Sequence, residues 1–364
     1  MNQTLSRTLF AALAVSLCLS TNQAALGVDE LTAKLIKADQ VMKSGKAKLA
    51  VDMLRDLVRS NPDSAQAHMQ LGAALATAAE KDDYDTAVLE EKQALKIDSK
   101  CFGARIILGH IYANQNKTSE SIAILKEACE MRPTSFGAHR DLGIACLTGG
   151  KIDDAMAAFR KANELRPKNS EAHMKLSILL SKRGNFRDAI AEANEAVQNG
   201  NGDPENHLAL ANILLESGDE NGSVDSFKNA LRGNHAHNPL TEANALSGLG
   251  WAIASKDPGK NDVEEGILDQ RRAIKTFPPF SPAYVRLAEL LVKQDKNKEA
   301  EAVYNEGLKI NPDDAGVGTS YAKFLGKLGR KDDAKTALKR VLEKSPQFKP
   351  ASDELAALEQ GSTK

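Results

Sequence analysis

The chain has 364 residues, of which 42% are hydrophobic and 4% aromatic, a composition that favours helix over sheet. Its 48 lysine and arginine residues are balanced by 49 aspartate and glutamate residues, and no basic cluster is interleaved with aromatic residues. We therefore expect an all-α protein with enough apolar residues for a substantial core, and we expect no nucleic-acid partner.

The N-terminal segment has the three-part pattern of a secretory signal peptide, with Arg7, an apolar run over residues 9–19 and then a polar stretch with small residues. The run is 11 residues long, whereas a bilayer span needs roughly 20, so an uncleaved anchor is the weaker alternative. Lipidation at Cys18 is a second alternative, but Leu17 is bulkier than the small residue found before the lipidated cysteine in lipoprotein signals. We predict a signal peptide over residues 1–25 and an exported mature chain, periplasmic or extracellular, without membrane insertion.

Three cysteines remain outside this segment, Cys101, Cys129 and Cys146. An odd number without paired CxxC spacing indicates neither a disulfide framework nor a zinc site. We expect small buried hydrophobic residues, and one disulfide between Cys129 and Cys146 is the alternative in an oxidising compartment.

Four similar pentapeptides indicate an internal repeat: AHMQL, AHRDL, AHMKL and NHLAL, which contain His68, His139, His173 and His207. The last three histidines are 34 residues apart, and His68 precedes His139 by 71 residues, which is two periods and three extra residues. A fixed period in this range is typical of stacked helix-pair repeats. Extending the register predicts about nine units over residues 30–348, followed by a capping helix and tail over residues 349–364.

The unit AHRDLGIACLTGGKIDDAMAAFRKANELRP carries a known pattern, with Leu142 and Gly143, then Ala155 and Phe159, then Pro167. With this pattern the chain resembles the tetratricopeptide repeat family over nearly all of its mature length. The resemblance implies a right-handed superhelical solenoid, whose concave face is made by the first helix of each pair and holds peptides or partner proteins.

Two positions of every unit hold a small residue. The eighth positions are Ala38, Gly72, Gly109, Gly143, Ser177, Ala211, Gly250, Ala288 and Ala322. The twentieth positions are Ala50, Ala87, Ser121, Ala155, Ala189, Ser223, Gly266, Ala300 and Ala334. Because helices packed about 8 to 10 Å apart need short side chains where they cross, we expect the two helices of each pair to cross here.

The seventh unit, about residues 233–283, departs from the pattern through two insertions and the rigid segment PPFSP. We expect a change in the course of the solenoid there, as at a hinge. The alternative is an ordinary surface insertion, which solenoids tolerate.

The repeated histidines fall at the fourth position of their units, where the family usually carries tryptophan, so we expect packing residues. His68 lies two units from His139 and cannot share a zinc ion with it, because zinc needs its ligands about 2.0 to 2.1 Å away. His235 and His237 are more plausibly part of a polar turn than a metal site. The chain has no catalytic or nucleotide-binding fingerprint. We therefore predict no metal, no cofactor and no enzymatic activity.

Transferring the family's groove positions onto this chain gives candidate partner contacts. They are Met69, His110, Asn114, Arg140, Met174, Lys182, Asn212, Glu216, Trp251, Glu289, Lys293, Lys323 and Lys327. From these we select Asn114, Arg140, Lys182, Asn212, Trp251, Glu289 and Lys323 as partner-binding residues.

Trp251 is the only tryptophan, and it lies off the helical stripe formed by Leu246, Leu249 and Ile253. We expect an uncovered indole on the concave surface, and the alternative is an indole folded back over a neighbouring helix. The sequence thus predicts an exported, non-enzymatic scaffold for a protein or peptide partner, in envelope assembly or secretion, and carries no signal for the oligomeric state. The rival hypothesis is a glycan-processing or other enzyme accessory with a groove-borne active site.

Overall fold

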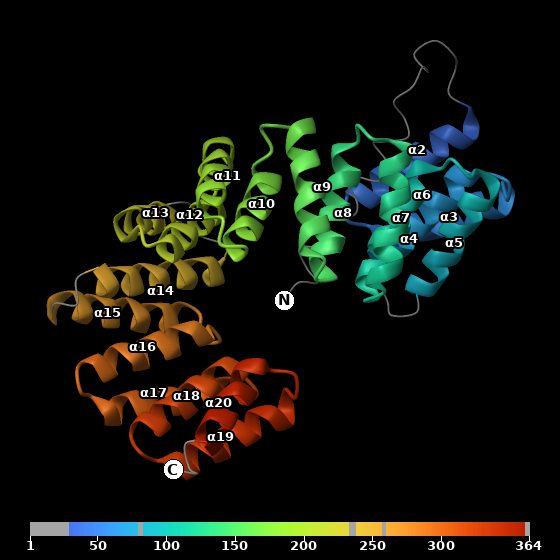
Figure 1. The fold of residues 1–364 in the computed structure, drawn as a ribbon. Helices are drawn as coiled ribbons and strands as arrows, with labels where there is room; N and C mark the ends of the chain where they lie inside the picture. The colour runs from blue at the N-terminus through green and yellow to red at the C-terminus, as the bar shows by residue number, and fades with distance from the viewer. Residues whose placement is uncertain (1–28, 79–82, 233–237, 257–259, 361–364) are drawn as a thin grey trace. The chain divides into compact units, whose positions relative to one another are not determined.

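A computed structural model describes residues 29–78, 83–232, 238–256 and 260–360, and all regular structure in these residues is helical (Figure 1). The predicted signal peptide lies outside the described residues. The chain divides into two compact units, Met1–Pro167 and Lys168–Lys364.

The first unit contains four antiparallel helix pairs. The pairs are α2 (Glu30–Lys43) with α3 (Ala47–Ser60), α4 (Ala65–Ala78) with α5 (Asp83–Ile97), α6 (Phe102–Asn114) with α7 (Thr118–Met131), and α8 (Phe136–Thr148) with α9 (Ile152–Leu165).

The second unit contains five pairs and a final helix. They are α10 (Ser170–Lys182) with α11 (Phe186–Asn199), α12 (Pro204–Ser217) with α13 (Glu220–Arg232), α14 (Pro239–Lys256) with α15 (Lys260–Thr276), α16 (Ser281–Lys293) with α17 (Asn297–Ile310), α18 (Ala315–Lys327) with α19 (Lys331–Lys344), and α20 (Lys349–Gln360). The prediction of an all-α solenoid of about nine helix pairs with a final helix is confirmed.

Several first helices begin at a side chain that caps the free backbone amides of the first turn. Asn169 Oδ1 accepts a hydrogen bond from the Ala172 amide at 3.0 Å, and Asp314 Oδ1 accepts one from Val317 at 2.9 Å. Within each unit a first helix packs against its own second helix and against the next first helix, as α14 does with α15 and α16. Within each of the two compact units, the first helices of successive pairs therefore share a common surface.

The small residues at the eighth and twentieth positions are buried in every pair. A Cβ atom added to Gly266 would lie 2.6 Å from the Gly250 carbonyl oxygen, and one added to Gly250 would lie 2.9 Å from the Gly266 carbonyl oxygen. The two helices of this pair thus meet backbone to backbone at the predicted crossing.

The division at residues 167 and 168 falls within the run of repeats that we predicted over residues 30–348. Residues 233–283, where we expected a change of course, lie inside the second unit. The insertions there accompany longer helices: α14 and α15 have 18 and 17 residues, against 13 to 15 in the other pairs. The loop residues 233–237 and 257–259 lie outside the described residues.

The final helix α20 covers the end of the ninth pair. Ala351 is fully buried, and Leu355 and Leu358 pack against the core of α16 to α19. No helix in the described ranges is long and apolar enough to cross a membrane.

Candidate functional site

Two of the four repeated histidines, His68 and His173, make contacts within their helix pairs. The His68 ring is buried, with Nδ1 2.6 Å from Glu90 Oε2 and Nε2 2.9 Å from the Pro62 carbonyl oxygen. His173 repeats the first contact with Glu192, also at 2.6 Å. Since both glutamates lie on the second helix of the same pair, these histidines join the two helices, which agrees with the packing role expected from their register.

In the described part of the chain, no group of three or more His, Cys, Asp or Glu side chains is arranged to hold a metal ion. His235 and His237 lie outside that part. Cys101, Cys129 and Cys146 are buried free thiols. Burial, with a contribution from the Asp141 charge, raises the pKa of the Cys129 thiol to about 12.

In the first unit, Asn114 is exposed at the end of α6, but Arg140 is not on a solvated helix face. The Arg140 side chain is buried and donates from Nε and Nη2 to Asp141 Oδ1, at 2.9 and 2.7 Å. His110 Nε2 lies 2.9 Å from Asp141 Oδ2. Burial alone would raise the pKa of Asp141, but His110 and Arg140 hold it below its ordinary value. Arg140 is therefore part of a buried charge network.

Two of the selected residues in the second unit lie on its first two first helices, α10 and α12. Lys182 is exposed at the end of α10, and Asn212 is half-buried, with Nδ2 donating to the Leu208 carbonyl oxygen of its own helix at 2.9 Å.

The remaining three candidates come together on the successive first helices α14, α16 and α18. Trp251, Glu289 and Lys323 all occupy the ninth position of their units, and Lys293 and Lys327 occupy the thirteenth. Together with Arg286 they form a group that we name the tryptophan cluster. Its members are Trp251, Arg286, Glu289, Lys293, Lys323 and Lys327.

Cations surround both Trp251 and Glu289. Lys293 Nζ lies 5.3 Å and Arg286 Cζ 6.0 Å from the centroid of the Trp251 ring, distances at which a cation interacts with an aromatic face. Desolvation raises the pKa of the Glu289 carboxyl. The positive charges of Lys327, Arg286, Lys293 and Lys323 act in the opposite direction and lower this pKa, but by less. The cluster thus carries four cations, one carboxylate and one indole, and one of the cations, Lys323, also pairs with Glu354 on α20 at 3.9 Å.

Hydrogen bonds to buried residues of α14 and α15 fix the position of Arg286. Arg286 Nη1 donates to Ser247 Oγ on α14 at 3.0 Å, and Ser247 Oγ donates to Gln270 Oε1 on α15 at 2.7 Å. Gln270 Nε2 returns a bond to the Ser247 carbonyl oxygen at 2.8 Å. Because Ser247 and Gln270 are fully buried, this arrangement holds the guanidinium in place before any partner arrives.

The expectation of an uncovered indole is wrong. Trp251 is half-buried and packs against a small core of Ala254, Val263 and Leu290. Ser247 and Ala254, which lie on the same side of α14 as Trp251 in a helical projection, are fully buried. The reason is that α14 contacts α12, α13, α15 and α16, so that little of its circumference reaches solvent.

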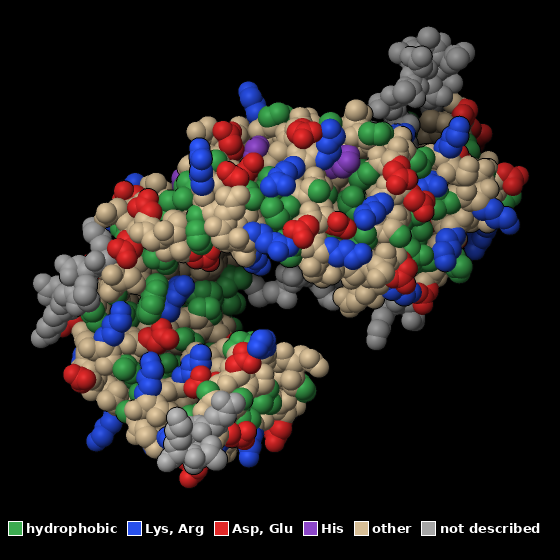
Figure 2. All heavy atoms as spheres, in the orientation of Figure 1, with side chains coloured by type: hydrophobic (Ala, Val, Ile, Leu, Met, Phe, Trp, Pro, Cys, Tyr) green, Lys and Arg blue, Asp and Glu red, His purple; other side chains and the backbone are tan. Residues whose placement is uncertain are grey.

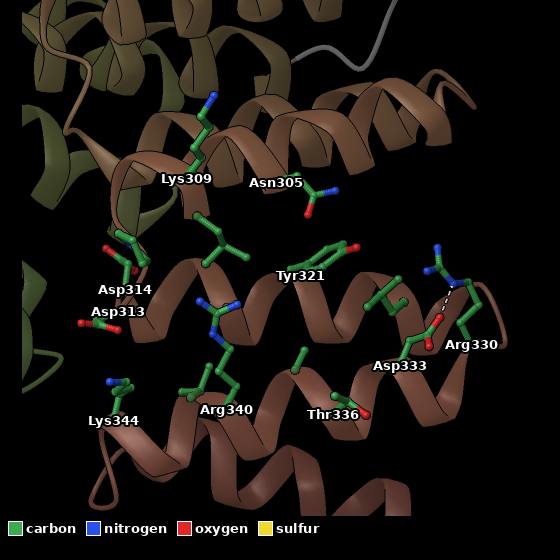
Figure 3. Close-up of a pocket in the computed structure, with 16 residues that line it drawn as sticks. Asn305, Lys309, Asp313, Asp314, Tyr321, Arg330, Asp333, Thr336, Arg340 and Lys344 are labelled. Carbon is green, nitrogen blue, oxygen red and sulfur yellow. Dashed lines mark hydrogen bonds and ion pairs between the residues drawn. The ribbon is translucent and has the colours of Figure 1, made fainter.

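A separate cavity of about 540 Å³ opens between α17, α18 and α19 (Figure 3). Leu308, Leu325 and Val341 provide apolar lining. At one end Arg330 donates to Glu301 and Asp333 at 2.7 and 2.8 Å, as Figure 3 shows for Asp333. The rest of its rim mixes both signs of charge, like the face of the molecule drawn in Figure 2, where lysine, arginine, aspartate and glutamate are interspersed. The groove positions transferred from the family do not fall in this cavity, because second helices and turns provide most of its lining.

The described residues thus define a helix-pair repeat protein with one charged, aromatic cluster on the first helices of its second unit. Models described as tetratricopeptide repeat match residues 37–100, 108–170, 147–213, 281–314 and 318–347. These matches cover more than half of the chain, which belongs to the tetratricopeptide repeat proteins.

Solved structures share the fold at low sequence identity. The crystal structure of the APC/C hetero-tetramer Cut9-Hcn1 is similar, with a TM-score of 0.51 and 17% identity, over 92% of this chain and 67% of that one. PilF of Pseudomonas aeruginosa has a TM-score of 0.49 and 20% identity, over 56% of this chain and 90% of that one. YrrB, described as a TPR protein with an unusual peptide-binding site, has a TM-score of 0.45 and 15% identity, over 53% and 95% of the two chains. No curated protein matches the sequence.

Proposed function

We propose that this protein is an exported, non-enzymatic scaffold that holds a protein or peptide partner against the tryptophan cluster. The observation that carries the proposal is the convergence of Trp251, Glu289 and four cations on α14, α16 and α18. Tryptophan and arginine dominate the binding energy of many protein interfaces. A cluster that already has its charges placed loses less entropy when a partner binds.

The cluster also argues against the rival hypothesis of a glycan-processing accessory. Its six side chains include one carboxylate, Glu289, whereas glycoside hydrolysis ordinarily uses a pair of carboxyl groups. A sugar ring stacks on an open aromatic face, whereas Lys293 and Arg286 already lie 5.3 and 6.0 Å from the indole centroid. A polypeptide partner can instead add carboxylates to these cations and an apolar side chain to the indole edge.

Export is supported by the N-terminal pattern around Arg7 and residues 9–19. Intact-mass measurement of the protein from envelope or secreted material should give a chain shorter by about 23 to 27 residues. Recovery of the full-length chain from the cytosol alone would contradict export without affecting the binding proposal.

Site-specific photocrosslinking tests the binding proposal. A photoreactive residue at Lys327, in the cluster, should capture one stoichiometric partner protein from the native compartment. The same group at Lys228, which is exposed on the second helix α13 of the same unit, is the matched control. Equal capture from both positions, or turnover of a small substrate by the purified protein, would contradict the proposal.

A further inference from the structure

A cleft in the first unit has an unusual set of side chains. It has a volume of about 510 Å³ and lies where α7 ends, α8 begins and α9 ends. Its charged lining residues are Arg132, Arg140 and Arg166, and no carboxylate lines it. We name it the arginine cleft.

Two of the three arginines keep an uncompensated charge. Arg140 is neutralised by Asp141, to which it donates two hydrogen bonds. The side chains of Arg132 and Arg166 have neither a hydrogen bond nor an ion pair with any residue in the described ranges. The cleft therefore presents two guanidinium groups whose N–H donors have no protein acceptor there.

Aromatic rings hold these two guanidinium groups in place. Arg132 Cζ lies 4.3 Å from the Phe102 ring centroid, and Arg166 Cζ lies 4.7 Å from the Phe136 centroid. Stacking occupies the flat face of a guanidinium and leaves its N–H groups free in the plane, in the fork geometry that pairs with a carboxylate. The stacked side chain also loses less freedom on binding.

The two arginines are not a requirement of the repeat. Each is the residue that directly follows the second helix of its pair, and the two are 34 residues apart, like Phe102 and Phe136. Four other pairs have short side chains at this place: Asn61, Gly200, Asn311 and Ser345. Since those pairs fold without the arginine, the guanidinium pair serves something other than the fold.

The rest of the lining indicates what kind of oxyanion fits. Met131, Pro133, Phe136 and Leu165 supply apolar surface, which a bare inorganic ion would leave uncovered. A polypeptide can fill this surface with an aliphatic side chain while carboxylates on either side of it meet the two guanidinium groups. We propose that the arginine cleft is a second binding site, for an acidic peptide segment in which two carboxylate side chains flank an apolar one.

The probe for this proposal is a fluorescein-labelled hexapeptide of alternating glutamate and leucine, titrated with the whole protein and followed by fluorescence anisotropy. The double variant Arg132→Gln with Arg166→Gln should weaken binding at least tenfold. The matched control, Arg160→Gln with Arg187→Gln, removes the same charge from exposed positions outside the cleft and should change binding less than twofold. Equal weakening by both pairs would show a nonspecific charge effect and overturn the proposal.

Two further arms keep the test independent of folding defects. Arg132→Lys with Arg166→Lys keeps the charge but loses the planar fork, and should weaken binding by an intermediate factor. Replacing glutamate by glutamine in the peptide should abolish binding to the unmodified protein. If that peptide still binds, or if inorganic phosphate displaces the acidic peptide with an equal affinity, the cleft is not a peptide site. Because Trp251→Ala leaves this cleft untouched, the loss of hexapeptide binding caused by Arg132→Gln with Arg166→Gln should be the same with and without Trp251→Ala, whatever the outcome at the tryptophan cluster.

Discussion

Lys293 on α16 places its Nζ atom 5.3 Å from the ring centroid of Trp251 on the neighbouring first helix α14. Both residues were expected on the partner-binding face from their register alone, and the structure brings them into contact. The contact gives the indole two roles, since the same side chain packs on Leu290 and Val263 below.

Trp251→Ala should therefore lower stability as well as weaken binding. Replacing a fully buried tryptophan by alanine lowers the free energy of unfolding by about 3 to 5 kcal/mol. Because Trp251 is half-buried, we expect a loss of about 2 kcal/mol. Urea unfolding monitored by circular dichroism measures the loss. Trp251→Phe keeps most of the packing and should lose less than half as much, whereas an unchanged midpoint for Trp251→Ala would show that the indole is not part of the core.

The buried pair of Asp141 and Arg140 should make stability depend on pH in one direction. Because the folded-state pKa of Asp141 is below its ordinary value, its ionisation stabilises the protein above about pH 4, and this contribution disappears as the pH falls through the folded-state pKa. Asp141→Asn leaves Arg140 buried without its counterion and should cost about 3 kcal/mol or more at pH 7.

Unfolding curves for this variant at pH 7 and at pH 3 provide the measurement, with Asp225→Asn, at an exposed position of α13, as the control. The difference in the free energy of unfolding between Asp141→Asn and the unmodified protein should be smaller at pH 3 than at pH 7. A difference that stays constant, or that grows in acid, would contradict the pairing.

The backbone crossing of α14 and α15 predicts whether a glycine-to-alanine substitution there raises or lowers stability. Alanine at position 266 would place its Cβ atom 2.6 Å from the Gly250 carbonyl oxygen, so Gly266→Ala should destabilise by about 1 to 3 kcal/mol. Gly326→Ala meets only Leu358 Cδ2 at 3.6 Å and should be stabilising or neutral, because alanine favours helix. Equal melting temperatures for the two variants would mean that the helices do not cross at Gly266.

The three cysteines should behave as buried thiols. With its pKa raised to about 12, Cys129 has almost no thiolate at pH 8 and should not react with an aromatic disulfide reagent until the protein unfolds. In a chain that has lost the predicted signal peptide, and with it Cys18, three thiols should then titrate in denaturant without reductant. A count of one would indicate a disulfide between Cys129 and Cys146 in the native environment.

The sequence predicted the features that depend on periodicity and side-chain size. Gly250 and Gly266 cross where the register placed them, and Trp251, Glu289 and Lys323 converge because the ninth positions of successive units lie on adjacent first helices. Register alone did not predict the burial of Arg140, because its partner Asp141 is the next residue, and neighbours along a helix do not ordinarily face each other.

Other features depend on contacts that have no local signal. Arg286 joins the tryptophan cluster through buried Ser247, and the free guanidinium groups of Arg132 and Arg166 follow from the absence of a carboxylate nearby. The division after Pro167 has no compositional mark, since Pro167 closes its unit as proline closes several others.

The central claim is that the tryptophan cluster is the partner-binding surface. The most direct measurement is the dissociation constant of the partner recovered by crosslinking. It is compared between two double variants. The cluster variant combines Lys293→Ala with Lys327→Ala, and the control combines Lys228→Ala with Lys339→Ala, which removes two exposed lysines from second helices of the same compact unit. We predict at least a tenfold weakening, or about 1.4 kcal/mol, for the cluster variant and less than a twofold change for the control. Equal affinities of the two variants would contradict the claim.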